Sequence, residues 1–245
     1  LAGAVTQIIK LGTAHITAAK TQDYALLTYG TALSWNERIE VSLARQEFNA
    51  NVVVPDTTLK LDIVGVKARV AGDAVLDSDT LMPQIALGLQ YKRTDAGALG
   101  PTLFGPLGAK DHGVDVYASA TKLILAQGVL VNGTLRATKA NQNGLLGFGG
   151  AQSDNYKLQP EVSIAVLLRK DVALGAEYRA KPDNLNRSVL GNGALKEEDW
   201  FDVFIAWAPS KHFSLTAAYV DLGKIVPALQ PKRQNGAYLS AQLSF

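Results

Sequence analysis

The chain contains no cysteine, one methionine and only three histidines among its 245 residues. Without cysteine it can form neither a disulfide framework nor a thiolate metal site. Its sequence has no run near the roughly 18–20 apolar residues that a membrane-spanning helix needs, so helical spanning is excluded. The formal net charge is only +2 and basic runs are missing, so we expect no nucleic acid among its partners.

What the chain does contain is alternation of apolar and polar residues along nearly its whole length. In the last nine residues the odd positions from Ala237 to Phe245 are apolar, and the even positions carry polar atoms. A strict period of two is typical of a β-strand with one apolar and one polar face. Similar apolar rows lie within residues 25–35, 39–43, 64–70, 83–91, 114–120, 129–135, 162–168, 172–178, 201–207 and 213–219. With a first strand near residues 10–20, the pattern predicts about twelve strands.

The connections between these segments alternate in length. Short turns are predicted at residues 36–37, 126–127, 169–171 and 209–211, and long Gly/Pro/Asn-rich loops at 49–58, 95–112, 141–156, 181–199 and 223–235. This alternation is typical of an up-and-down antiparallel barrel of the bacterial outer membrane, with periplasmic turns and extracellular loops. We therefore predict an all-β transmembrane barrel over residues 9–245. We expect residues 1–8 to form a separate N-terminal segment, either a strand or a lumen plug.

The polar rows help to choose between this barrel and a soluble sandwich or lipocalin-like barrel. They carry mostly serine and threonine, whereas a solvated outer face usually carries denser lysine and glutamate. Aromatic residues add a weaker argument, because they fall near strand ends as two interfacial girdles would require. Ordinary aromatic enrichment in strands is the alternative explanation. The expected girdle residues are Trp35, Trp207 and Phe245 on the turn side, and Tyr29, Tyr91, Tyr178 and Tyr219 on the loop side.

The C-terminal strand also predicts how the barrel is recognised. A chain that stops on Phe after an alternating strand resembles outer-membrane barrels whose terminal aromatic strand is read by the barrel-assembly machinery. We assign this signal to Tyr238 and Phe245. The expected partners are that machinery, outer-membrane lipid and lipopolysaccharide, with a protein partner or a homo-oligomer left open.

Longer stretches resemble a Gram-negative family catalogued only as a domain of unknown function. They are DYAL at 23–26, RIEVSLARQEF at 38–48, LDIVGVK at 61–67, NGTLRATKANQ at 132–142, GLLGFGG at 144–150, AEYRAKPDNL at 176–185 and AYVDLG at 218–223. The resemblance covers nearly the whole chain and implies an outer-membrane barrel with no established activity. Members of the family carry a Gly-rich stretch between segments like 1–8 and 9–23, which are directly joined here, so the topology of residues 1–20 stays open.

Placing alternate residues inward assigns a set of charged side chains to the lumen. Lys67 and Arg69 on one strand and Lys92 on the next would form a basic strip. Charged rows in a bore set its selectivity, so we predict a narrow channel for small solutes with a mild preference for anions. The alternative is that the charges pair across the bore and close it, leaving a structural barrel that docks a partner protein. The selectivity residues are Lys67, Arg69, Lys92, Arg136, Arg179, Glu161, Glu177 and Asp202.

The long loops are unusually apolar. Exposed, these residues would form a vestibule for uptake of a hydrophobic compound, or a partner surface. Folded inward, they would form a plug over the lumen. The residues are Leu99, Leu103, Phe104, Leu107, Leu145, Leu146 and Phe148.

The sequence gives little support to an enzyme. Acyl transfer needs a histidine near a serine and a carboxylate or amide. His112 lies beside Asp111 without an obvious serine partner, His212 lies at a turn, and His15 lacks metal-ligand spacing. We therefore predict no catalytic residue, no metal and no cofactor.

Overall fold

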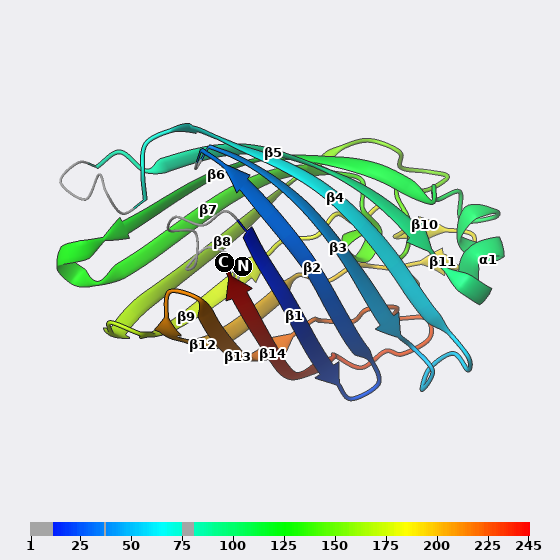
Figure 1. The fold of residues 1–245 in the computed structure, drawn as a ribbon. Coiled ribbons are helices and arrows are strands. Elements are labelled where there is room, and N and C mark those ends of the chain that lie inside the picture. The colour runs from blue at the N-terminus through cyan, green and yellow to red at the C-terminus, as the bar shows by residue number, and fades with distance from the viewer. Residues whose placement is uncertain (1–11, 37, 75–80) are drawn as a thin grey trace.

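The computed structural model describes residues 12–36, 38–74 and 81–245. Twelve antiparallel strands close one barrel in the order β1-β14-β13-β12-β9-β8-β7-β6-β5-β4-β3-β2 (Figure 1). The predicted fold class and strand number are confirmed. The predicted N-terminal segment 1–8 lies outside the described residues.

The barrel strands begin and end close to the predicted segments. They are β1 (Gly12–Thr21), β2 (Ala25–Trp35), β3 (Ile39–Asn49), β4 (Thr58–Ala71), β5 (Gln84–Asp95), β6 (His112–Ile124), β7 (Val129–Thr138), β8 (Lys157–Arg169), β9 (Val172–Arg179), β12 (Trp200–Ser210), β13 (Phe213–Asp221) and β14 (Asn235–Ser244). The loops contain the short helices η1 (Gly97–Leu99), α1 (Gly100–Phe104), η2 (Leu125–Gln127) and η3 (Asn141–Gly144), and the strands β10 (Arg187–Ser188) and β11 (Gly191–Asn192). No helix in the described ranges is long and apolar enough to span a membrane.

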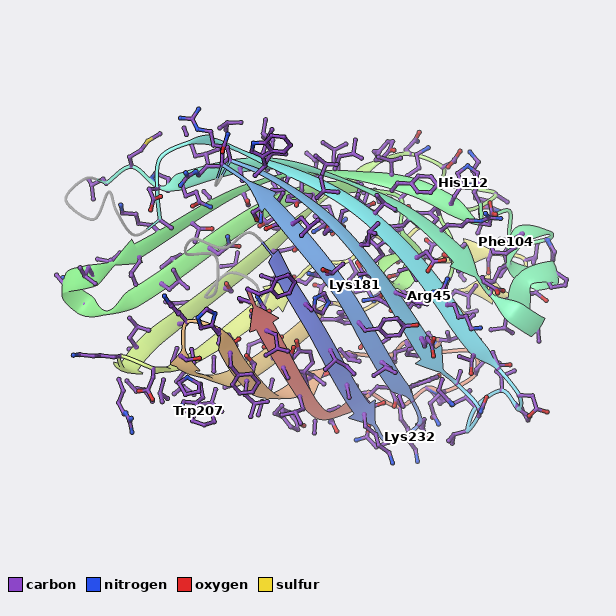
Figure 2. All side chains as sticks on the ribbon, in the orientation of Figure 1. Arg45, Phe104, His112, Lys181, Trp207 and Lys232 are labelled. Carbon is purple, nitrogen blue, oxygen red and sulfur yellow. The ribbon has the colours of Figure 1, made fainter. Side chains whose placement is uncertain are left out.

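Alternation along each strand sorts side chains onto two faces, because successive residues point to opposite sides of a sheet. Apolar side chains such as Leu33 and Leu43 are exposed on the outer face, while small polar ones such as Thr17 and Ser240 are buried inside. Thr17 and Ser240 hydroxyls bond across the β1–β14 seam at 2.7 Å. The girdle aromatics are all exposed, and Figure 2 shows Trp207 at the end of the barrel opposite Phe104 and His112.

The barrel closes where β1 meets β14. Their register runs from Thr13 opposite Ser244 to Thr21 opposite Gly236. Beyond it, the Gly12 and Phe245 backbones exchange two hydrogen bonds of 3.0 Å. The Phe245 ring covers Gly12 so closely that a Cβ there would lie 2.6 Å from the ring. The aromatics of the predicted assembly signal thus lie on opposite faces, since Tyr238 points inward and Phe245 is exposed.

The two ends of the barrel differ in the length of their connections, as the sequence predicts. One end, the turn end, carries short connections such as residues 36–38 and 170–171, although residues 72–83 form a longer one. The other end, the loop end, carries the connections 50–57, 96–111, 139–156, 180–199 and 222–234 (Figure 1). The main apolar core lies at the loop end, where loops pack against the inner wall.

Candidate functional site: a plugged, charge-paired lumen

The apolar loop residues form a plug inside the loop end of the barrel. Leu103, Leu107, Leu145, Leu146 and Phe148 are buried in one cluster, and Leu99 and Phe104 pack against it. The wall side of this cluster comes from inward residues of β3 and β4, namely Phe48, Leu59 and Leu61. The structure therefore brings all seven predicted loop residues together as an internal plug.

The Phe148 ring packs against two glycines, one in the wall and one in the plug itself. The ring packs on Gly113 of β6, where an added Cβ would lie 2.3 Å from Cδ1 of the ring. An added Cβ at Gly144 would lie 3.0 Å from the same ring and 3.2 Å from Leu61. The Phe148 backbone also exchanges two 2.9 Å hydrogen bonds with Lys110. Glycine at 113 therefore creates the space that the plug occupies.

The tip of the plug is a polar turn in a left-handed backbone conformation. Gln142, Asn143 and Gly144 have φ values of 46°, 62° and 111°. Residues other than glycine pay an energy cost in this region, so surrounding contacts must hold the turn. The Gln142 side chain donates to the Ile225 carbonyl at 2.8 Å, and its backbone N–H donates to Glu197 Oε2 at 2.9 Å.

A buried ion pair from the loop between β9 and β12 completes this lock. Lys181 Nζ lies 3.5 Å from Glu197 Oε2, donates to the Gln142 side-chain oxygen, and sits 4.1 Å from the centroid of the Trp200 ring. Both charged groups are almost wholly buried. Burial lowers the pKa of Lys181 to about 8 and raises the pKa of Glu197 to about 7, because it penalises each charged form. We call Gln142, Lys181 and Glu197 the plug lock.

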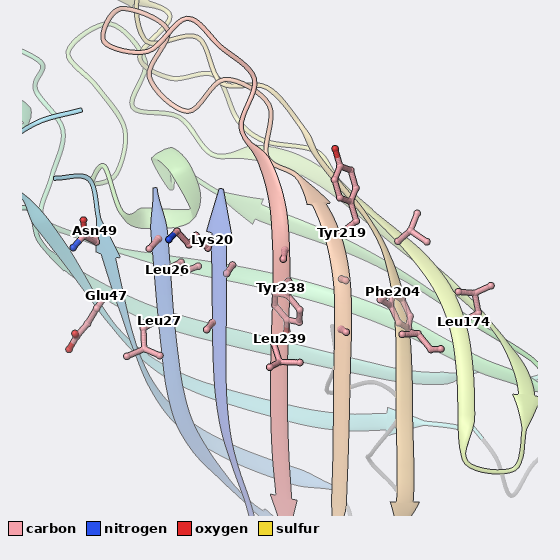
Figure 3. Close-up of a pocket in the computed structure, with 18 of the residues that line it drawn as sticks. Lys20, Leu26, Leu27, Glu47, Asn49, Leu174, Phe204, Tyr219, Tyr238 and Leu239 are labelled. Carbon is pink, nitrogen blue, oxygen red and sulfur yellow. The ribbon is translucent and has the colours of Figure 1, made fainter. Parts of the chain in front are cut away.

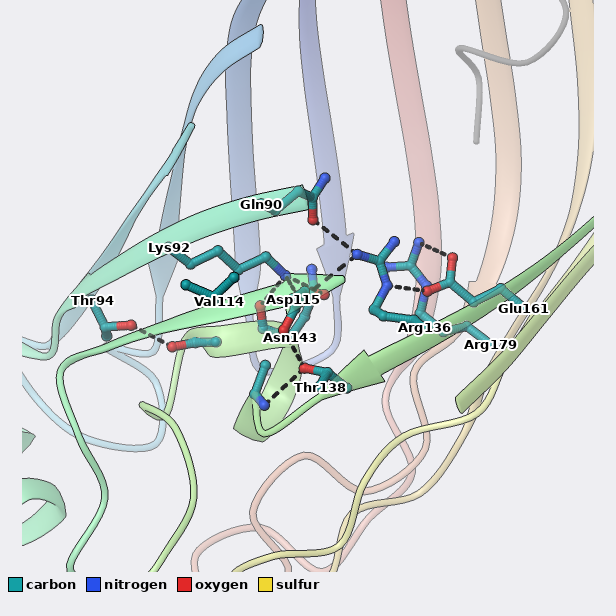
Figure 4. Close-up of polar contacts among 12 residues, drawn as sticks. Gln90, Lys92, Thr94, Val114, Asp115, Arg136, Thr138, Asn143, Glu161 and Arg179 are labelled. Carbon is teal, nitrogen blue, oxygen red and sulfur yellow. Dashed lines mark hydrogen bonds and ion pairs between the residues drawn. The ribbon is translucent and has the colours of Figure 1, made fainter. Parts of the chain in front are cut away.

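A second buried ion pair, between β5 and β6, anchors the same turn (Figure 4). Lys92 Nζ lies 2.7 Å from Asp115 Oδ2, and the two side chains are 2% and 0% exposed. Lys92 also donates to the Asn143 carbonyl at 3.2 Å and to its side-chain oxygen at 3.3 Å. Thr138 donates its hydroxyl hydrogen to Asp115. Lys92 thus holds the plug tip instead of facing an open bore.

Arg136 and Arg179 share one carboxylate further round the wall (Figure 4). Glu161 lies 2.6 Å from Arg136 Nε and 3.2 Å from Arg179 Nη2. Arg136 also donates to Gln90 at 2.9 Å and lies 4.9 Å from the centroid of the Tyr117 ring. Two of the predicted selectivity cations are therefore paired with a predicted selectivity acid.

The predicted basic strip of Lys67, Arg69 and Lys92 is not formed. The β4–β5 register places Gly88 opposite Lys67 and puts Lys92 opposite Ile63, four residues along β4. Lys67 instead lies 3.0 Å from Glu40, and Arg69 lies 2.5 Å from Asp73. That interpretation was wrong because sequence shows which face a residue occupies but not the stagger between strands.

Glu177 and Asp202 form an acidic pair on the inner wall. They stand directly opposite each other in the β9–β12 register, and both face inward. Arg179, on the same face of β9, stands opposite Trp200. Glu177 stands opposite Ser163, two residues along β8 from Glu161, the carboxylate that pairs with both arginines.

Exposure divides the lumen into two halves. Toward the turn end, charged side chains keep contact with solvent, as Lys67 and Glu40 do at 20% and 23%. At the level of Lys92 and Asp115 the lumen is filled by side chains and by the plug tip. The lumen is therefore a polar chamber closed at the loop end.

Two apolar spaces lie near the plug. A cavity of about 40 Å³ lies inside it, lined by plug residues such as Leu145 together with Gln142 and Trp200. An open hollow of about 940 Å³ lies along the wall from β3 to β9 and is lined largely by alanine and leucine (Figure 3). Its lining includes the outward Leu27 and Leu239 and the inward Leu26 and Tyr238. The lining of the hollow therefore comes from both faces of the barrel wall, where many of the side chains are alanine.

The histidines do not assemble into a catalytic site among the described residues. His112 Nδ1 lies 2.7 Å from Asp111 on the exposed rim, and its ring contacts Tyr91. His212 Nδ1 lies 2.9 Å from the Ser244 carbonyl at the turn end. No group of three or more metal-ligating side chains lies together within the described ranges.

Sequence reasoning missed the plug lock. Gln142, Lys181 and Glu197 lie in loops, where alternation does not predict which way a side chain points, and Gln142 meets Lys181 and Glu197 across 39 and 55 residues of chain. The one available signal was the polar run Asn141–Gly144 within an apolar loop, since Asn and Gly tolerate left-handed backbone.

Solved structures with this architecture are outer-membrane barrels of low sequence identity. The NanC porin aligns with a TM-score of 0.60 and 6% identity, covering 96% of this chain and all of that one. Omp33 of Acinetobacter baumannii aligns at 0.54 with 10% identity, covering 96% and 98%. Outer membrane phospholipase A of Escherichia coli aligns at 0.51 with 11% identity, covering 98% and 96%. These likenesses show the fold, which a porin and a phospholipase share.

One curated relative also matches. Mitochondrial homoaconitase from Neurospora crassa is 26% identical over 172 residues, or 64% of this chain. The match spans only 22% of that protein's length, so it lends this chain none of its activity.

The family is shown by a match over almost the whole sequence. Residues 2–242 match the family described as "Protein of unknown function (DUF3034)". The predicted resemblance is confirmed, and its motifs supply both strands of the wall and the plug turn. The chain is a member of this family of barrels of unknown function.

Proposed function

We propose that the chain is an outer-membrane channel for small solutes, in a state whose loop-end mouth is closed by the plug. The supporting observation is the solvent-accessible polar chamber that ends at a plug fixed largely by side-chain hydrogen bonds and ion pairs. A solid structural barrel would not need a hydrated inner row of charges. In this proposal lipid and lipopolysaccharide surround the apolar face, and the loop end faces outward.

The plug is held by a limited set of contacts, which makes opening feasible. The Gln142 side chain accepts one bond from Lys181 and donates one to Ile225, each worth about 1 kcal/mol. Gln142→Gly removes both bonds, a loss of about 2 kcal/mol, while relief of the left-handed backbone returns about 1 kcal/mol to the closed turn. The closed-to-open equilibrium should therefore shift by roughly fivefold toward open.

Planar-bilayer recording of the purified chain tests the proposal. We expect rare openings in the parent protein and frequent openings in Gln142→Gly. The control is Asn36→Gly, which makes a comparable backbone change at φ 49° in a turn-end connection and should leave conductance unchanged. Silence of both the parent and Gln142→Gly, with folded barrels, would refute a channel and favour a closed barrel that docks a partner.

A further inference from the structure

We infer that the outer wall binds one molecule of lipid A, the phosphorylated glycolipid that anchors lipopolysaccharide, in the open hollow beside the β1–β14 seam. The inference rests on the proposed outer-membrane placement, with the loop end outward, and it goes beyond the channel because it stands whether or not the barrel conducts. It is carried by the shape of the hollow and by the position of one lysine, Lys20 (Figure 3).

The floor of the hollow is a row of apolar side chains, two of them very short, on the outer face of the wall. Ala18 of β1 stands between Leu27 of β2 and Leu239 of β14, and Leu239 in turn stands opposite Ala217 of β13. All four are exposed. A methyl group extends less far from the sheet than a leucine side chain, so the wall is indented at the alanines. The leucines on either side can therefore pack against an inserted hydrocarbon chain.

The size of the hollow suits a lipid with several acyl chains. Its volume is about 940 Å³, at the upper end of the range for small-molecule sites. Its lining runs around the wall from β3 to β9, across β2, β1, β14, β13 and β12. At about 4.8 Å between neighbouring strands, that path is roughly 29 Å long. A two-chain phospholipid would cover only part of this width, whereas lipid A carries more than two chains.

Lys20 supplies a positive charge at the loop-end edge of the floor. It is exposed on the outer face, next to the last residue of β1. Ala25 and Ala237 stand opposite it on the two neighbouring strands, so the side chains directly beside it are methyl groups. Within the described part of the chain Lys20 is in no ion pair, whereas the outward Arg45 is bound by Asp62 at 2.6 Å. Its ammonium group is therefore available to a lipid phosphate.

Two further polar side chains lie along the same edge. Asn49 on β3 and Tyr219 on β13 line the hollow, each two strands away from Lys20. Their amide and hydroxyl groups can bond to the sugar hydroxyls of a glycolipid while Lys20 binds a phosphate oxygen. The acidic residue of the lining, Glu47, also lies two strands away and already accepts a hydrogen bond from Tyr29 at 3.2 Å. A polar edge with one free cation above an apolar floor matches a phosphorylated sugar above acyl chains.

Native mass spectrometry of the folded barrel, released from micelles that contain lipid A, phosphatidylglycerol or phosphatidylcholine, tests this inference. We expect one lipid A to stay bound, and Lys20→Gln to weaken its retention by roughly fivefold, the effect of one lysine near an anionic surface. Ala18→Phe should also weaken retention, without a change of charge, because the ring fills the floor. The matched controls are Lys60→Gln and Ala118→Phe, which change exposed outward residues of β4 and β6 outside the hollow.

The outcomes separate the possible occupants. Retention of one lipid A that Lys20→Gln and Ala18→Phe weaken, and the controls do not, supports the site. Equal retention of neutral phosphatidylcholine, or lipid A retention that neither variant alters, overturns it. Phosphatidylglycerol bound as tightly as lipid A overturns the assignment to a multi-chain lipid, and dimers that Ala18→Phe abolishes would assign the hollow to a second copy instead.

Gel mobility with and without heating identifies any variant that fails to fold, and the remaining variants then decide. Lipid retention is measured without any current, and the bilayer recordings of Gln142→Gly are made without reference to lipid A. The lipid site and the channel can therefore fail separately.

Discussion

At the scale of single residues, the buried charges of the wall act as structural pairs. Lys92→Met should destabilise the barrel by about 3 kcal/mol, because it leaves the buried Asp115 with only the more distant Arg136, 3.7 Å away, as a cation. The double variant Lys92→Met/Asp115→Asn should recover most of this loss, since no buried charge is then unpaired. Urea unfolding in lipid vesicles, followed by tryptophan fluorescence, measures both. A single variant as stable as the parent would show that this pair is hydrated.

The contact between Gly113 and Phe148 predicts how a larger residue at position 113 would affect the packing of the plug. Gly113→Ala places a methyl group against the Phe148 ring and should cost the seated plug about 1–3 kcal/mol. Limited trypsin digestion of the loop 139–156 should therefore quicken. Gly133→Ala is the matched control, because a Cβ at 133 meets no atom within 4 Å. Equal digestion rates in the two variants would contradict the packing described for Phe148.

At the scale of elements, we expect the loop between β9 and β12 to couple plug closure to pH. Burial raises the pKa of Glu197 from 4.5 to about 7 in the closed plug. Protonation of Glu197 therefore stabilises the closed plug as pH falls below about 7. This stabilisation is complete below the ordinary pKa of 4.5, and it is lost as pH rises above about 7. Between pH 5 and 7 Lys181 stays mostly protonated in both states, and burial raises the pKa of Asp183 in the same direction as that of Glu197.

We accordingly expect open probability to fall by up to about tenfold per pH unit on acidification from pH 7 to pH 5. Glu197→Gln should remove most of this dependence, because the amide does not titrate. Bilayer recordings at matched salt give the comparison. An unchanged pH profile in Glu197→Gln would mean that another group controls the response.

At the scale of the whole molecule, the outer apolar band predicts a membrane environment. Leu43→Arg places a charge on an exposed position of β3 and should cost about 2–4 kcal/mol if lipid covers that face. Val52→Arg makes the same change on an exposed loop residue and should be nearly neutral. Unfolding from lipid vesicles measures the two. Equal tolerance would indicate that water, not lipid, covers the band.

Several features of this molecule were predictable because they depend on local pattern. Alternation identified the strands and placed residues such as Lys67 and Asp202 on the inner face. The lengths of the connections identified the turn end and the loop end of the barrel. The apolar loops left two interpretations open, and the structure places them inside. The pairing of Lys92 with Asp115 and Asn143 could not be predicted, because it depends on strand register and on a loop that enters the barrel.

The sequence by itself determined a closed barrel with one apolar and one polar face, because a period-two pattern depends only on residues that are neighbours in the sequence. Tertiary structure alone decided that the plug is seated, that Gln142 bonds with Ile225 across 83 residues, and which carboxylate neutralises which cation. Those contacts follow from the stagger between strands and the path of the loops. Both are set by the energy of the whole barrel rather than by any one segment.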